Sequence, residues 1–274
     1  MSKILENKKV LNNQVLMPQF GLGTYKMTDE KETLEAIKHA LKVGYRHIDT
    51  AQFYNNHKII AKAIKDSGIP RSEIFITSKI WITDFNNPEA AFDRILSELE
   101  TDYIDLCLIH WFSPGWEQTY KVLEQKYADK KARAIGVSNF TINQLKKLFE
   151  ISKITPMVNQ IELHPQLPCI DLVNFCHDNN IAVTSWQTIM RGEVSKIDVI
   201  VDLSKKYNAT PAQIALRWAW DRGIIVIPKS SNNSRIEQNF DIEGFALTEE
   251  EIKVINNLQP ERRLGPDPEK TDEL

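Results

Sequence analysis

Residues 104–110 read Ile-Asp-Leu-Cys-Leu-Ile-His, a largely apolar run of strand length that ends on a histidine. Two earlier runs have the same form: Tyr45–Ile48 is followed by Asp49, and Ile74–Thr77 is followed closely by Lys79. Runs without polar alternation are typical of parallel strands buried on both faces. The carboxyl ends of successive parallel strands meet in space, and in a closed β/α barrel they surround the active site. The sequence therefore predicts that these polar side chains converge.

The rest of the chain repeats this order of strand and then helix. Eight strand-like runs are each followed by apolar residues at helical spacing, and strand ends recur about every 25–30 residues, except for a longer gap before the last. A short hairpin precedes them, with Asn12-Asn13 as a turn that can adopt positive φ. We therefore expect one domain over residues 1–274, a (β/α)8 TIM barrel with an N-terminal β-hairpin. The expected strands are 20–23, 45–48, 74–77, 104–109, 132–137, 157–161, 181–185 and 224–227.

Charge, apolar runs and cysteine spacing limit the partners and the location that the chain can have. The formal net charge of −3 gives no reason to expect nucleic acid or an anionic membrane. The first ten residues lack the apolar stretch of a signal peptide, and no apolar run approaches membrane-spanning length. Three cysteines do not suggest a disulfide framework, and no spacing matches a common metal site. We therefore expect a cytoplasmic protein with no metal and no nucleic-acid or membrane partner, monomeric unless an oligomer is found.

Four side chains at or just after the strand ends can together protonate a substrate oxygen: Asp49, Tyr54, Lys79 and His110. A phenol titrates near pH ~10 in water, so it is a poor donor at neutral pH unless a nearby cation lowers its pKa. Lys79 can supply that cation, and Asp49 can keep Lys79 charged. Neutral His110 can orient the oxygen. Because this set supplies a proton and no electrons, a hydride-donating cofactor is expected.

A polar loop near the C-terminus is suited to hold such a cofactor. Residues 227–239 run from a strand end through hydroxyl and amide side chains into a helix start, where free backbone N–H groups attract phosphate. Lys229 adds a point charge and Arg235 a bidentate fork, which suits a phosphate monoester such as the 2′-phosphate of NADPH. The alternative is a capped helix with two solvated cations.

Further residues at strand ends could contact the two small molecules. Ser138, Asn139 and Gln160 could fix a carboxamide such as that of nicotinamide, and Trp186 could stack on its ring. Aromatic residues after three strands suggest an apolar substrate pocket; they are Tyr25, Trp81, Trp111, Phe112 and Trp116.

These motifs resemble those of the aldo-keto reductases over nearly the whole chain. The matching segments are Gly44–Ala51 with Tyr54, Thr77–Trp81, Leu108–Trp111, Gly136–Phe140, Asn159–Glu162 and Ile227–Asn239. The resemblance implies a (β/α)8 barrel that binds NADPH across its C-terminal face and reduces small aldehydes, ketones, dicarbonyls or keto-sugars with Tyr54 as general acid. It also implies that Lys229, Ser230 and Arg235 hold the 2′-phosphate.

The full cofactor set expected from this resemblance and from the strand ends is Gly23, Thr24, Asp49, Ser138, Asn139, Gln160, Trp186, Gln187, Thr188, Ile189, Arg191, Lys229, Ser230, Ser231, Asn232, Arg235, Gln238 and Asn239. The expected substrate contacts are Tyr25, Tyr54, Trp81, His110 and Trp111. Relative to the family pattern, His57 replaces a usual glutamate and Gln187-Thr188-Ile189 replaces a Ser-Pro-Leu-like stretch. Residues 191–196 are too few for a large lid over the cofactor.

Two other functions stay open at this point. Lys79 could form a Schiff base, as in barrel aldolases, although Asp49 would keep its amine protonated. The chain could also be a non-catalytic NADPH-binding regulatory protein, because a fold does not fix a function.

Overall fold

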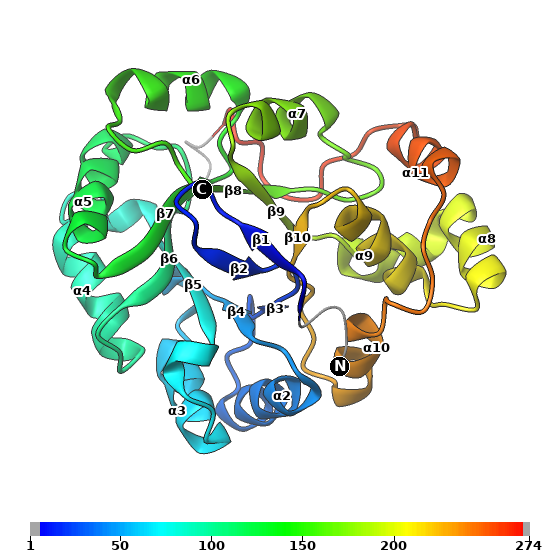
Figure 1. Cartoon of the computed structure of the whole chain (residues 1–274), viewed down its shortest axis with the longest axis horizontal. Helices are drawn as coiled ribbons and strands as arrows, with labels where there is room; N and C mark the ends of the chain where they lie inside the picture. Colours follow the sequence, from blue (N-terminus) through cyan, green and yellow to red (C-terminus); the bar gives the residue numbers. More distant parts are fainter. Residues whose placement is uncertain (1–5, 271–274) are drawn as a thin grey trace.

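Eight parallel strands form the centre of the molecule, a barrel that helices surround (Figure 1). The structure is a computed structural model that describes residues 6–270, so both ends of the expected domain, 1–5 and 271–274, lie outside the described residues. Each strand pairs with the next one in sequence. The strands are β3 (Leu22–Gly23), β4 (His47–Asp49), β5 (Phe75–Ile80), β6 (Ile104–Ile109), β7 (Ala132–Ser138), β8 (Val158–Glu162), β9 (Ala182–Trp186) and β10 (Ile225–Val226).

The first and last strands meet and close the barrel. Phe20 bridges Val226 and Gly23 bridges Lys229, both in parallel orientation. The amide of Gly23 donates to the carbonyl of Pro228 at 3.1 Å. A Cβ on Gly23 would collide with the carbonyl oxygen of Ile227, so this position needs glycine for the close approach of the two strands. The expected (β/α)8 barrel is confirmed.

The helices follow the strands as expected, with shifts of a few residues at most ends. They are α2 (Glu30–Val43), α3 (His57–Ser67), α4 (Pro88–Glu98), α5 (Trp116–Ala128), α6 (Ile142–Ile151), α7 (Ile170–Asp178), α8 (Asp198–Tyr207), α9 (Pro211–Asp221), α10 (Asn233–Phe240) and α11 (Glu249–Asn256). Helices α6, α9 and α11 begin with capping boxes, at Thr141, Thr210 and Thr248. In each box the threonine and the residue three positions later accept a hydrogen bond from each other's backbone amide. Two helices, α8 and α9, lie between β9 and β10 and explain the longer gap before the last strand.

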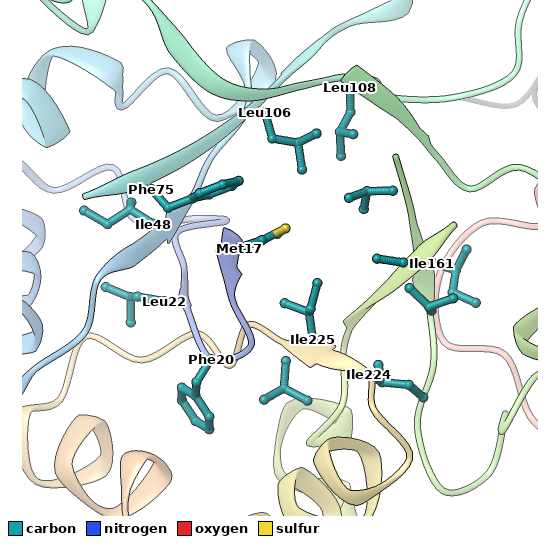
Figure 2. Packing of buried hydrophobic residues seen from close by; sticks show 14 of the residues in the cluster. Met17, Phe20, Leu22, Ile48, Phe75, Leu106, Leu108, Ile161, Ile224 and Ile225 are labelled. Atoms are coloured by element: carbon teal, nitrogen blue, oxygen red, sulfur yellow. The ribbon is translucent and has the colours of Figure 1, made fainter. Parts of the chain in front are cut away.

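A hairpin of β1 (Lys8–Val10) and β2 (Leu16–Pro18) covers the N-terminal end of the barrel. Met17 is fully buried there and points into the barrel among apolar residues of several strands (Figure 2). The positive φ of the turn falls on Gln14, at 69°, and not on Asn12-Asn13 as expected. The two asparagines instead donate side-chain hydrogen bonds to the carbonyls of Pro156 and Arg133. They therefore fasten the hairpin to the strand starts.

The structure bears on two expectations from composition, the state of the cysteines and the lack of a membrane-spanning segment. Cys107 and Cys176 are buried, free thiols whose pKa burial raises, and Cys169 is a partly exposed free thiol. Within residues 6–270 no helix is both long and apolar enough to cross a bilayer. A cytoplasmic location and a monomeric state stay predictions.

Candidate active site

The four expected catalytic residues come together at the C-terminal end of the barrel. Asp49 is the last residue of β4, Lys79 lies near the end of β5, and His110 directly follows β6. Tyr54 ends the 3₁₀ turn η1 (Gln52–Tyr54) after β4. Asn55 then adopts a left-handed conformation (φ 53°), which turns the chain sharply toward α3. The convergence that the strand ends predict is therefore present.

Lys79 and Asp49 form a buried ion pair. The ammonium donates to Asp49 Oδ1 at 2.7 Å and to the carbonyl of Thr50 at 2.8 Å, and the two side chains are 0% and 3% exposed. Gln160 Nε2 donates to Asp49 Oδ2 at 2.7 Å, so both carboxylate oxygens are bound. Burial lowers the pKa of Lys79 and raises that of Asp49, and their mutual attraction opposes both shifts. The added hydrogen bonds favour the charged form of the pair.

The strand that carries Lys79 is anchored from outside by His57. His57 Nδ1 lies 2.9 Å from Glu98 Oε2, and its Nε2 lies 2.9 Å from Ser78 Oγ. The imidazole therefore links α3, α4 and β5 at the residue next to Lys79. Although histidine replaces the family's usual glutamate at this position, both ring nitrogens of His57 have hydrogen-bond partners.

Tyr54 lies over this pair and beside His110. The Lys79 ammonium is 5.1 Å from the centroid of the Tyr54 ring, and the rings of Tyr54 and His110 are 5.8 Å apart, edge to face. Burial raises the pKa of the Tyr54 phenol well above its ordinary value of 10.0, and Asp49 and Tyr25 raise it further. The net pKa of Tyr54 therefore lies above its ordinary value and not below it as expected, because burial is the largest influence on it; that Lys79 stabilises the phenolate stays a prediction. Tyr54 keeps its proton at neutral pH, which is the form a proton donor needs.

His110 is a neutral imidazole at the same site. Burial lowers its pKa well below the ordinary 6.5, and the Lys79 charge lowers it further. Its Nδ1 is buried with no partner among residues 6–270. A neutral ring at this place can hold a substrate oxygen without competing with Tyr54 as the acid.

Aromatic rings form the mouth of the site. Tyr25 is 45% exposed and lies 5.0 Å from the Tyr54 ring, and Trp81 lies 4.8 Å from the His110 ring. Phe53, 47% exposed, stacks on Trp81 at 4.2 Å. Sequence reasoning missed Phe53, although its place beside Tyr54 could have indicated it.

The other expected pocket residues are less open. Trp111 is 5% exposed, so its substrate contact stays a prediction. Phe112 and Trp116 pack with Phe140, with ring centroids 5.0–6.0 Å apart. These three rings therefore form a separate packed cluster.

The residues expected to fix a carboxamide form a connected network. Asn139 Nδ2 donates to the His110 carbonyl at 3.0 Å and to Ser138 Oγ at 3.1 Å, and its Oδ1 accepts from Trp186 Nε1 at 2.9 Å. Ser138 Oγ donates to the carbonyl of Gln160 at 2.8 Å. The network connects the indole of Trp186, which is partly exposed, through Asn139 to the backbone of His110. Asn139 and Gln160 thus already hold other parts of the site, and their direct contact with the nicotinamide stays a prediction.

Several other expected cofactor residues have mainly backbone or internal contacts. Thr24 is fully buried, and its Oγ1 donates to the Asp49 carbonyl at 2.8 Å. Thr188 Oγ1 lies 2.6 Å from Ser185 Oγ. Gln187 has a positive φ of 60°, and its Oε1 is buried without a partner in the described part of the chain. The next turn, η4 (Met190–Lys196), has seven residues and includes Arg191 at a φ of 54°.

The loop before α10 carries the two cations expected to bind a phosphate, next to a helix start that its own side chains cap. Asn232 caps α10 by accepting from the Arg235 amide at 3.0 Å, and Ser230 Oγ accepts from the Asn232 amide at 3.1 Å. Lys229 and Arg235 are exposed, and neither makes an ion pair within residues 6–270. Two unpaired cations at a helix N-terminus fit a phosphate monoester. The remaining residues expected here are Ile189 and Ser231, which are partly exposed, Gln238, which is exposed, and Asn239, which is buried.

Comparisons with known proteins identify the family of the chain. A family model described as the Aldo/keto reductase family matches residues 19–260. The chain is 45% identical over 271 residues to the 9,11-endoperoxide prostaglandin H2 reductase of Trypanosoma cruzi, covering 96% of this chain and 95% of that protein. It is 41% identical over 274 residues to glyoxal reductase of Bacillus subtilis, covering 98% and 99%.

Two solved structures extend the comparison. An aldo-keto reductase from a deep-sea metagenome library of the Medee basin superposes with a TM-score of 0.93 at 41% identity, covering 96% of this chain and 99% of that chain. An aldo-keto reductase of Bombyx mori in complex with NADP has a TM-score of 0.84 at 33% identity, covering 91% and 92%. The chain belongs to the aldo/keto reductase family, and it is an NADP(H)-dependent oxidoreductase.

Proposed function

We propose that this enzyme reduces small aldehydes and dicarbonyl compounds to alcohols with NADPH, and that Tyr54 donates the proton. One arrangement carries the proposal. The buried ion pair of Lys79 and Asp49, 2.7 Å apart, lies under the protonated phenol of Tyr54, which is next to the neutral imidazole of His110. The alternative function, in which Lys79 forms a Schiff base with the substrate, is not favoured. The Lys79 amine is fully buried and bound to two oxygens.

The residues divide the work as follows. NADPH, when bound, supplies the hydride that goes to the carbonyl carbon. His110 holds the carbonyl oxygen, and Tyr54 gives its hydroxyl proton to that oxygen as the C=O double bond becomes a C–O single bond. Lys79 stabilises the phenolate that this leaves on Tyr54, because its ammonium lies 5.1 Å from the centroid of that ring. Asp49 and Gln160 keep the ammonium in place.

The mouth of the site supports a class of substrate. Tyr25, Phe53 and Trp81 offer apolar ring faces, and Tyr25 and Phe53 are nearly half exposed. Such a surface binds compact carbonyl compounds with apolar or flat substituents. The Bacillus subtilis relative is named for glyoxal, the smallest dicarbonyl.

The test is NADPH consumption with a panel of glyoxal, methylglyoxal, aromatic aldehydes and keto-sugars. We expect turnover with the small dicarbonyls and aromatic aldehydes and less with the sugars, whose hydroxyl groups have few partners in an aromatic mouth. Tight NADPH binding without turnover of any carbonyl compound would contradict the proposal and would support a regulatory protein.

Arg235→Ala is expected to raise the Kd of NADPH by about 10-fold or more while changing that of NADH little. A charge-assisted hydrogen bond to a phosphate contributes about 1.5–3 kcal/mol, and NADH lacks the 2′-phosphate. The measurement is titration of both cofactors by calorimetry. Arg94→Ala removes an exposed arginine on α4, paired with Asp84, and should leave both Kd values unchanged. Equal losses for the two cofactors would show that Arg235 does not bind the 2′-phosphate.

A further inference from the structure

The segment that follows α11 returns to the barrel and is bound by one carboxylate, Glu162 at the end of β8. Glu162 Oε1 accepts from the amides of Leu264 at 2.6 Å and Gly265 at 3.1 Å, and Oε2 accepts from the Gly265 amide at 3.1 Å. Arg263 Nη1 lies 3.2 Å from Oε2. In Figure 1 this segment, drawn in red, runs back from α11 toward β8. One acidic side chain therefore holds the backbone of a segment about 100 residues away in sequence.

Glu162 is built to stay ionised. It is 1% exposed, and buried His164 lies 3.1 Å from Oε1. Burial alone would raise the pKa of Glu162, but the bonds from His164, Leu264 and Gly265 outweigh burial and hold that pKa below its ordinary value. None of the proposed catalytic steps uses this carboxylate. Burying a charged carboxylate costs free energy, so its burial needs an explanation other than catalysis.

Gly265, which Glu162 fixes, lies against the Trp186 indole. A Cβ on Gly265 would stand 2.9 Å from Trp186 Cζ3 and closer still to Cη2, distances that real side chains do not adopt. At the other end of the indole, Nε1 donates to Asn139 Oδ1 at 2.9 Å. The ring is thus held at its polar end by Asn139, which follows β7, and at its benzo end by the C-terminal segment.

We propose that Glu162 is a positioning residue that, through the backbone of Leu264 and Gly265, sets the place of the Trp186 indole and so the seat of the nicotinamide ring. This rests on the proposed role of Trp186 in stacking on the cofactor. The segment has other attachments: Arg262 Nη1 pairs with Glu193 at 2.8 Å, and Gln144 Nε2 donates to the Pro268 carbonyl at 3.0 Å. Loss of the Glu162 bonds therefore shifts the segment locally and does not release it.

The first test is Glu162→Gln, which keeps the shape but turns an amide N–H2 toward backbone donors. We expect the Kd of NADPH to rise by about 5–10-fold and kcat to fall by about 10-fold, since a misplaced reacting centre is costly, with the carbonyl KM little changed. In the protein without cofactor, hydrogen exchange should become faster at the amides of Leu264 and Gly265. Wild-type Kd and wild-type exchange would overturn the proposal.

Gly265→Ala is the second variant, and it leaves the Glu162 carboxylate intact. Its methyl group would overlap the indole and would stand 3.2 Å from Glu162 Oε2, so the ring or the segment must shift, and we expect the same rise in the NADPH Kd. In a Trp186→Ala background neither Glu162→Gln nor Gly265→Ala should weaken NADPH further, because coupled residues are not additive. Full additive losses in that background would show that the effect does not act through the indole and would overturn the proposal even if Glu162→Gln fails to fold.

Asp105→Asn is the matched control. Asp105 is also a buried carboxylate, but it lies at the N-terminal end of β6 and pairs with Arg71 at 2.8 Å and Arg133 at 2.7 Å. We expect it to lower the melting temperature and leave the NADPH Kd unchanged. If Asp105→Asn lost as much NADPH affinity as Glu162→Gln, the loss would reflect general destabilisation of the fold, and the proposal would be overturned. The affinity tests decide this inference even if no carbonyl compound is turned over, so its failure is distinct from failure of the proposed reaction.

Discussion

Tyr54→Phe is expected to bind NADPH as tightly as the wild type and to reduce carbonyl compounds about 10²–10⁴-fold more slowly, the usual contribution of a general acid. The change removes one hydroxyl and keeps the ring between Tyr25 and His110, 5.0 Å and 5.8 Å away. The aromatic mouth should therefore keep its form, and the carbonyl KM should change far less than kcat. The measurement is steady-state kinetics with a small dicarbonyl, together with the NADPH Kd by calorimetry.

The control for this variant is Tyr103→Phe, which removes a phenol oxygen at the opposite end of the barrel. Tyr103 precedes β6, and its ring lies under the guanidinium of Arg71 at 4.4 Å. Its turnover should equal that of the wild type. A Tyr54→Phe enzyme with unchanged turnover would remove the proposed acid, and one that no longer binds NADPH would point to a structural role for the hydroxyl.

Much of the catalytic geometry could be predicted from the sequence because the hydrophobic runs fix the strands. Once β4, β5 and β6 are adjacent, Asp49, Lys79 and His110 must share one end of the barrel. The pairing of Asp49 with Lys79 then follows from charge. The same reasoning predicted that Lys79 would bring the pKa of Tyr54 below its ordinary value, whereas that pKa lies above it. Sequence reveals which charges are near but not how much water a phenol loses, and here burial is the largest influence on that pKa.

The contacts that sequence reasoning missed depend on positions finer than a strand register. Gln160 was expected to face the cofactor, yet its Nε2 binds Asp49 across 111 residues of sequence. The partners of Glu162 are backbone amides of Leu264 and Gly265, which leave no side-chain signal. The hairpin turn is at Asn12-Asn13 as expected, but its positive φ falls on Gln14, while the side chains of both asparagines make tertiary hydrogen bonds.

Lys79→Met is the second variant with a large expected effect, and it should lose both stability and turnover. The substitution keeps a long side chain but leaves the buried Asp49 carboxylate without its cation, a change that costs about 3–5 kcal/mol of folding free energy. Burial already raises the pKa of Asp49 above its ordinary 3.8, and without Lys79 nothing of opposite charge at 2.7 Å opposes that shift. The folded state then binds more protons than the unfolded state above about pH 4, so stability falls as pH rises toward neutrality. Thermal melting of the variant between about pH 4 and pH 7 should show this slope, with the wild type flatter.

Asp49→Asn combined with Lys79→Met separates the two roles of the pair. The double variant has no buried charge at this site, and the amide oxygen introduced in place of the Asp49 carboxylate can still accept from Gln160 Nε2. Most of the lost stability should therefore return, and the pH slope should disappear. Turnover should not return, because no cation remains to stabilise the phenolate on Tyr54, whose ring centroid lies 5.1 Å from the place of the ammonium. If the double variant regained both stability and turnover, the pair would be a structural ion pair only, and the assistance to Tyr54 would have to come from His110 alone.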